Sequence, residues 1–109
     1  MVAQKYPNGY SGSRRIQNTE TFSRWLRSLR DTRGKARVLM RLKALQFGHL
    51  GDCRSLGGGL HELRIFVGPG YRIYLAYRHE AVVVLLCGGD KSSQPRDIVR
   101  ARQLLAELE

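Results

Sequence analysis

The spacing of apolar residues changes from a helical period in the first half of the chain to a strand period in the second. Four apolar residues recur at i, i+3, i+4 and i+7, namely Phe22, Trp25, Leu26 and Leu29. This spacing predicts an amphipathic helix that begins near Glu20 after an N-cap at Asn18 or Thr19. A break at residues 32–34 separates it from a second amphipathic helix, predicted over residues 35–46.

From residue 60 onward, apolar and polar residues alternate, which predicts strands over residues 60–67 and 71–78 joined by the Gly-Pro-Gly turn. The following run VVVLLC, residues 82–87, is apolar at every position. Such a run is typical of a central strand whose two faces are both covered. The preceding segment, residues 47–59, contains five glycines and is predicted to be a long loop, which is often a functional feature.

The predicted elements are completed by a short strand over residues 14–17 and a C-terminal helix. Ser92 or Ser93 would cap that helix, and Pro95 would lie in its first turn. The order is β-α-α-β-β-β-α, an α+β fold in which an N-terminal helical hairpin packs on a mainly antiparallel four-stranded sheet. Residues 14–109 are predicted to form a single domain, preceded by a flexible extension over residues 1–13.

The net charge of +10 is concentrated in the first half of the chain. Residues 1–54 hold 12 Lys and Arg against 3 acidic residues, whereas residues 55–109 hold 7 against 6. Such a field favours polyanions, nucleic acid above all, although a solvated basic helix surface is the alternative. The candidate RNA-binding residues are Arg24, Arg27, Arg37, Arg41, Lys43, Arg54 and Tyr71.

Cysteine usage and hydropathy predict a reduced, cytoplasmic protein. Cys53 falls in the glycine-rich segment and Cys87 in the apolar run, a pattern that does not suggest a disulfide framework, although a single bridge is the alternative. No apolar run has the ~18 residues of a membrane span, and the N-terminus has no signal-peptide core. The three histidines have no metal-ligand spacing with the cysteines, so we expect neither a metal nor a cofactor.

Two arginines face the same side of the predicted hairpin. Side chains alternate along a strand, so Arg64 and Arg72 project together with Glu62 near them, opposite the apolar face that must meet the helices. Guanidinium groups on an exposed sheet face suit a phosphate backbone. The alternative is a cross-strand pair between Glu62 and Arg72 that contributes less than about 1 kcal/mol.

The motif CGGDKSSQ, residues 87–94, follows the last predicted strand. Its two glycines allow the backbone to approach a ligand, and Lys91 would stand at the same edge beside a helix N-terminus. The alternative is a plain strand-to-helix turn with a serine cap. His61 is either a partly buried strand residue or an acid-base group.

The element order, the strand ELR (62–64), the segment GPGYRIYL (68–75), the VVVLLC strand and GGDKSSQ (88–94) together resemble the RelE/ParE toxin superfamily. More narrowly, the chain is similar to HigB-like "putative addiction module killer proteins" of type II toxin-antitoxin systems. The resemblance covers residues 14–109. It departs from RelE-type nucleases at the C-terminal helix RARQLLAELE, which carries neither the Tyr nor the His that such enzymes commonly place there.

This resemblance implies an mRNA endonuclease that acts on the ribosome, inhibits translation and is held inactive by a cognate antitoxin, here a HigA-like helix-turn-helix protein. In RelE-type enzymes the messenger's 2′-hydroxyl attacks the adjacent phosphate, and basic residues stabilise the charge that develops. By position, Arg72, Arg64 and Lys91 match the basic residues of that site. With Glu62 they would form a charge-based site, and His61 or Tyr71 would supply a proton donor or acceptor. The alternative is a ParE-like inhibitor of DNA gyrase that is not an enzyme.

Overall fold

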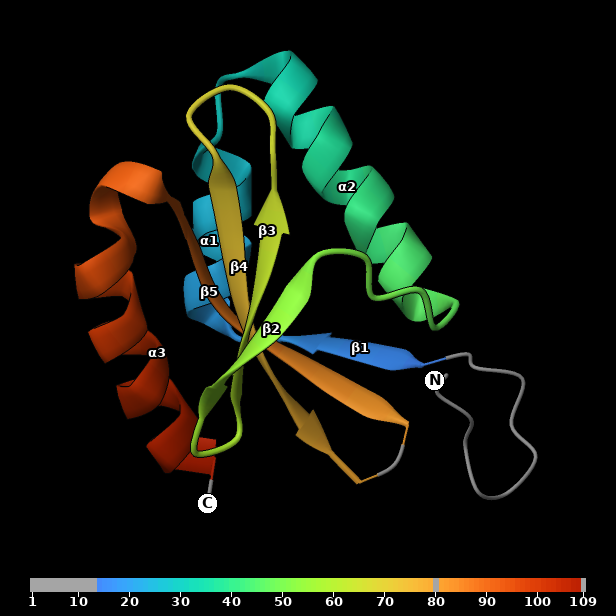
Figure 1. Ribbon diagram of the computed structural model, residues 1–109, viewed down its shortest axis with the longest axis vertical. Coiled ribbons are helices and arrows are strands. Elements are labelled where there is room, and N and C mark those ends of the chain that lie inside the picture. The colour runs from blue at the N-terminus through green and yellow to red at the C-terminus, as the bar shows by residue number, and fades with distance from the viewer. Residues whose placement is uncertain (1–13, 80, 109) are drawn as a thin grey trace.

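The computed structural model describes residues 14–79 and 81–108, and the extension predicted over residues 1–13 lies outside this range. A single sheet carries helices on both faces (Figure 1). The elements are, in chain order, β1 (Arg15–Asn18), α1 (Glu20–Ser28), α2 (Thr32–Gln46), β2 (Cys53–Gly57), β3 (Leu60–Ile65), β4 (Tyr71–Arg78), β5 (Val82–Asp90), the 3-10 turn η1 (Lys91–Ser93) and α3 (Gln94–Leu108).

The described residues form a five-stranded sheet in the order β1-β5-β4-β3-β2. β1 runs parallel to β5, and the other neighbours are antiparallel. The four-stranded sheet of the prediction is therefore wrong by one strand, because Cys53–Gly57 pairs with β3 instead of remaining a loop. Gly57, Gly58 and Gly59 all have positive φ, so these glycines reverse the chain sharply enough for the two strands to pair.

Side chains that cap the helices set where each helix begins. The Thr19 side chain accepts from the Phe22 N–H at 3.0 Å, as one of the two predicted caps for α1. α2 begins at Thr32, three residues before the predicted start, because the Asp31 carboxylate accepts from the Gly34 N–H. Asp90 caps the 3-10 turn η1, and α3 follows that turn directly at Gln94.

Two apolar cores lie on opposite faces of the sheet. α1 and α2 contribute Phe22, Val38 and Leu45 to the first core, and α3 contributes Ala101 and Leu104 to the second. β5 serves both cores, with Val83 and Leu85 on one face and Val84 and Leu86 on the other. The prediction of a central strand covered on both sides is confirmed, and any site on the sheet must therefore lie at an end or an edge of it.

Candidate functional site

The predicted arginine pair lies on β3 and β4, on the face that carries α3. Arg64 and Arg72 are directly opposite each other in the antiparallel register, and Glu62 is opposite Tyr74 in the next pair. The prediction that this face is open is wrong for two of these residues, because Glu62 is 0% exposed and Arg72 is 8% exposed. Tyr74 belongs to the core under α3, so the helix that buries the tyrosine also covers its polar neighbours.

Glu62 is the centre of a buried polar network. Its Oε2 accepts from Tyr74 Oη at 3.1 Å and from Gln94 Nε2 at 2.7 Å, and lies 3.5 Å from Arg72 Nε. Its Oε1 accepts from Arg54 Nε at 3.3 Å. A buried carboxylate is tolerated only when charge partners and hydrogen bonds replace its hydration, and Glu62 has both. Burial, followed by the Glu62 charge, raises the pKa of Tyr74, which keeps the phenol protonated as a donor.

Arg72 is held from two sides. Its Nη1 donates to the Gly70 carbonyl at 2.9 Å, while its Nε faces Glu62 as an ion pair without hydrogen-bond geometry. Arg54, the other guanidinium on Glu62, differs because 55% of its side chain is exposed. The network thus has one buried and one solvent-facing cation.

Arg64 lies at the edge of this network with its own acidic partner. Its Nη2 and Nε donate to Asp52 Oδ1 at 3.1 and 3.3 Å, and 29% of its side chain is exposed. Its Cζ lies 5.6 Å from the ring centroid of Phe66, which is 70% exposed. The sequence analysis did not include Phe66 among the candidate residues. Its position two residues after Arg64 could have indicated that it lies on the same face as the arginine.

The GGDKSSQ motif forms the junction between β5 and α3. A Cβ at Gly88 would overlap the Trp25 ring, and one at Gly89 would overlap the Asp97 carboxylate. Asp90 accepts from the N–H groups of Ser92 and Ser93 in a capping box. Packing and capping therefore explain the glycines and the cap residues.

Lys91, in contrast, is exposed. Its backbone N–H donates to the Pro69 carbonyl at 3.5 Å, so it adjoins the β3–β4 turn. The structure thus places Lys91 at the same end of the sheet as Arg72, whose Nη1 bonds to Gly70 in that turn.

Two residues predicted for the site lie on the opposite face of the sheet. His61 packs edge-on against Tyr77 at 4.9 Å between ring centroids, and burial lowers its pKa. Tyr71 is buried in the core under α1 and α2, and its hydroxyl donates to Asp31 Oδ2 at 2.9 Å. The structure therefore does not bring His61 or Tyr71 to the arginines, because the alternation that brings Arg64 and Arg72 together sends these two side chains to the other face.

The predicted basic surface of the helices is separate from the arginine pair. Its exposed members, on α1 and α2, are Arg24, Arg27, Arg37 and Lys43. Arg41 is an exception, because its Nη1 donates to the Arg64 carbonyl at 2.7 Å and its Nη2 to the Leu50 carbonyl at 2.8 Å. It holds the backbone of β3 and the loop after α2, which is a structural role.

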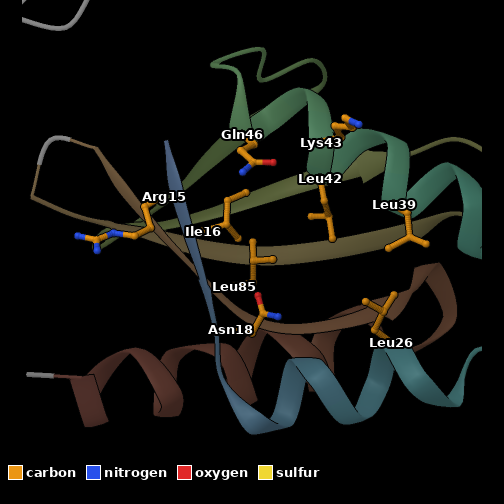
Figure 2. Close-up of a pocket in the computed structure, with 9 residues that line it drawn as sticks. All are labelled: Arg15, Ile16, Asn18, Leu26, Leu39, Leu42, Lys43, Gln46 and Leu85. Atoms are coloured by element: carbon orange, nitrogen blue, oxygen red, sulfur yellow. The ribbon is translucent and has the colours of Figure 1, made fainter. Parts of the chain in front are cut away.

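A groove lies between β1, α1 and α2, on the face away from α3 (Figure 2). It has a volume of about 530 Å³ and is lined by Arg15, Ile16, Asn18, Leu26, Leu39, Leu42, Lys43, Gln46 and Leu85. Figure 2 shows Leu39 and Leu42 from α2 on one side and Leu26 from α1 on the other. Among the residues that the structure describes, the lining combines an apolar floor with two cations and contains no carboxylate.

Some chemistries have no matching arrangement in the part of the chain that the structure describes. Among residues 14–79 and 81–108, no three His, Cys, Asp or Glu side chains gather as a metal site would require. Cys53 and Cys87 are both free thiols, and burial raises the pKa of Cys87 to about 12. No helix in the described ranges has the length and apolar character to cross a membrane.

Comparison with solved structures defines the fold class. The chain is similar to the E. coli toxin RelE, solved in its free state as a double arginine-to-alanine mutant, with a TM-score of 0.60. The match covers 78% of this chain and 92% of that one at 15% sequence identity. The domain therefore has a RelE-like fold.

Sequence comparison defines the family more closely. No protein-family model matches the chain. It is 50% identical over 93 residues to an uncharacterized protein of Haemophilus influenzae, a match that covers 85% of this chain and 94% of its relative. The chain belongs to the same family as that protein.

Proposed function

We propose that the protein is the toxin of a type II toxin-antitoxin module and cuts messenger RNA on the ribosome, in the cytoplasm. The observation that carries this proposal is the cluster of cations at one end of a RelE-like sheet: Arg54, Arg64, Arg72 and Lys91. Cleavage by the messenger's own 2′-hydroxyl builds negative charge on the phosphate. Preorganised cations stabilise that charge most where water is excluded.

The burial of each cation assigns it a role within this proposal. Arg64 and Arg54 reach solvent and would contact the phosphate directly, and exposed Lys91 lies beside the turn that Arg72 contacts. Arg72, which is 8% exposed, would stabilise the phosphate charge electrostatically from below the protein surface, without contacting the phosphate. Glu62 would orient Arg54 and Arg72 rather than exchange a proton, because it is fully buried, accepts three hydrogen bonds and pairs with the Arg72 guanidinium.

Primer extension on translated messages, with purified protein and ribosomes, tests the cleavage proposal. We expect cleavage within the ribosomal A site, and a loss of about 10²- to 10³-fold in rate for Arg64→Ala, the typical effect of removing one charge-stabilising donor. Arg100→Ala on the exposed side of α3 is the matched control, since it makes the same change in net charge. Absence of cleavage by the wild type, or equal rates in the two variants, would refute the proposal.

The alternative is a ParE-like inhibitor of gyrase, a function that needs no catalytic residues. It is favoured by the position of the three candidate proton-transfer groups, since His61 and Tyr71 lie on the far face and Glu62 is buried. A supercoiling assay with purified gyrase separates the two functions. The cleavage proposal predicts unchanged supercoiling and cut messages, whereas the gyrase-inhibitor alternative predicts stalled gyrase and intact messages.

The partner in this proposal is a cognate antitoxin, and the resemblance points to a HigA-like protein. The groove between β1, α1 and α2 suits an acidic amphipathic segment, because Leu39 in its wall is 47% exposed and the charged residues in its described lining, Arg15 and Lys43, are both cations. Exposed apolar residues continue along α2 at Met40.

Copurification with the product of the neighbouring gene tests this surface. We expect Leu39→Asp to abolish copurification, because it puts a carboxylate into the apolar wall, and Val99→Asp on α3 to leave it unchanged, since Val99 is also exposed but lies on the other side of the sheet. Toxicity of the Leu39→Asp variant should persist. Normal copurification of that variant would exclude the groove as the docking surface.

A further inference from the structure

The exposed ring of Phe66 lies against the guanidinium of Arg64. Phe66 is the residue directly after β3, at the start of the turn into β4, and it is 70% exposed. A large aromatic side chain loses a favourable burial of roughly 1.5–3 kcal/mol when it is left in water. The Arg64 Cζ lies 5.6 Å from its ring centroid, so the exposed ring adjoins a cation in the candidate site.

The surroundings of Phe66 fix the cation and leave the ring accessible. Asp52 accepts two hydrogen bonds from Arg64, at 3.1 and 3.3 Å, and the Arg64 carbonyl accepts from Arg41 at 2.7 Å. The turn that begins at Phe66 is tied at its far end to Lys91 through the Pro69 carbonyl. A held guanidinium, a neighbouring lysine and an open aromatic ring therefore occupy one rim of the sheet.

We propose that Phe66 is a stacking platform for an unpaired nucleobase of single-stranded RNA whose adjoining phosphate lies on Arg64. A nucleotide joins its base to its phosphate through one sugar, so adjacent aromatic and guanidinium groups can hold both parts. Stacking of a base on an aromatic side chain contributes about 1–3 kcal/mol and tolerates any base, since every base has a π-face. This inference rests on the proposed RNA substrate and names the part of the RNA that the rim binds.

Fluorescence anisotropy with a labelled single-stranded RNA oligonucleotide tests the inference. We expect Phe66→Leu to weaken binding by about 5- to 150-fold, which is the stacking free energy expressed as a ratio of Kd values. Phe66→Tyr should retain binding, because it keeps the aromatic ring. Phe47→Leu is the matched control, since Phe47 is 55% exposed but lies at the C-terminal end of α2 on the other face.

A second oligonucleotide with abasic sites separates stacking from a general effect on the rim. It keeps the phosphates and lacks the bases, so the wild type and Phe66→Leu should bind it equally. Equal affinity of the two proteins for the normal oligonucleotide would overturn the proposal, as would absence of wild-type binding or an equal loss on the abasic RNA. Urea unfolding confirms that each variant is folded, because surface changes usually stay within about 0.5 kcal/mol.

The result of this RNA-binding assay can be distinguished from a failure of the proposed RNA cleavage. If the wild type does not cut messages on ribosomes but its RNA affinity still depends on Phe66, the stacking platform stands and the nuclease does not. If messages are cut and RNA affinity is unaffected by Phe66→Leu, the nuclease stands and the platform does not.

Discussion

Replacing Glu62 by glutamine should destabilise the protein far more than a similar change at the neighbouring ion pair. Glu62→Gln keeps the size of the side chain and removes the charge that faces Arg54 and Arg72. Arg54 is half exposed and can turn to water, whereas Arg72 is 8% exposed and would keep an uncompensated charge. Asp52→Asn makes the same chemical change at Arg64, where both partners reach solvent.

The difference in burial sets the expected magnitudes. Removing one partner of a buried pair costs about 3–5 kcal/mol because a buried charge is left unpaired. A pair as exposed as that of Asp52 and Arg64, with side-chain exposures of 34% and 29%, contributes about 1 kcal/mol or less. The two variants should thus differ by at least about 2 kcal/mol in free energy of unfolding.

Urea unfolding followed by circular dichroism measures both values. With a slope of about 1–3 kcal/mol per M, the loss expected for Glu62→Gln lowers the unfolding midpoint by at least about 1 M. A double variant, Glu62→Leu with Arg72→Met, covers the case in which the single variant does not fold. Replacing both charges with apolar groups should recover most of the stability. Equal midpoints for Glu62→Gln and Asp52→Asn would refute the reasoning.

Three further predictions concern the β5–α3 junction, the thiols and acid stability. Gly89→Ala should cost about 1–3 kcal/mol by overpacking, measured by urea unfolding, because a Cβ there overlaps the first turn of α3. Cys87 should resist alkylation at pH 8 until the protein unfolds, since burial raises its pKa to about 12, and mass spectrometry should find half-buried Cys53 labelled first. Hydrogen bonds from the Gly34 N–H and a tyrosine lower the pKa of Asp31. This folded pKa lies below the unfolded value near about 4, so the stabilisation is present above that pH and is lost as pH falls through the folded pKa. Asp31→Asn should therefore flatten the acid limb of the stability curve.

The strand pattern predicted which side chains share a face, because alternation is a property of the extended backbone itself. It placed Arg64 and Arg72 on the same face of the hairpin with Glu62 near them, as the structure has them. The unbroken apolar run of β5 likewise predicted that both of its faces are covered. These inferences needed only the period of two and the hydrophobic effect.

The depth at which each polar residue lies could not be read from the same pattern. Glu62 and Arg72 are buried because α3 starts over their end of the sheet and brings Gln94 onto the carboxylate. That position depends on the cap at Asp90 and on how closely Gly89 lets the helix approach. The contact between Gln94 and Glu62 joins residues that are 32 positions apart in the sequence, so local spacing carried no signal for it.

The burial of the candidate proton-transfer groups leads to a last prediction. Cleavage of RNA by its own 2′-hydroxyl requires a proton acceptor and a proton donor in addition to phosphate-binding cations. Glu62 is enclosed by three hydrogen-bond donors and the Arg72 guanidinium, and His61 and Tyr71 lie on the opposite face from Arg64. If the protein is a nuclease, the ribosome must therefore complete the site by orienting the RNA and exchanging these protons. We expect the purified protein to bind the labelled oligonucleotide without cutting it, and to cut messages only when ribosomes are added. Gel electrophoresis measures both. Cleavage of free RNA that is abolished by Arg64→Ala would contradict the inference that the ribosome completes the site.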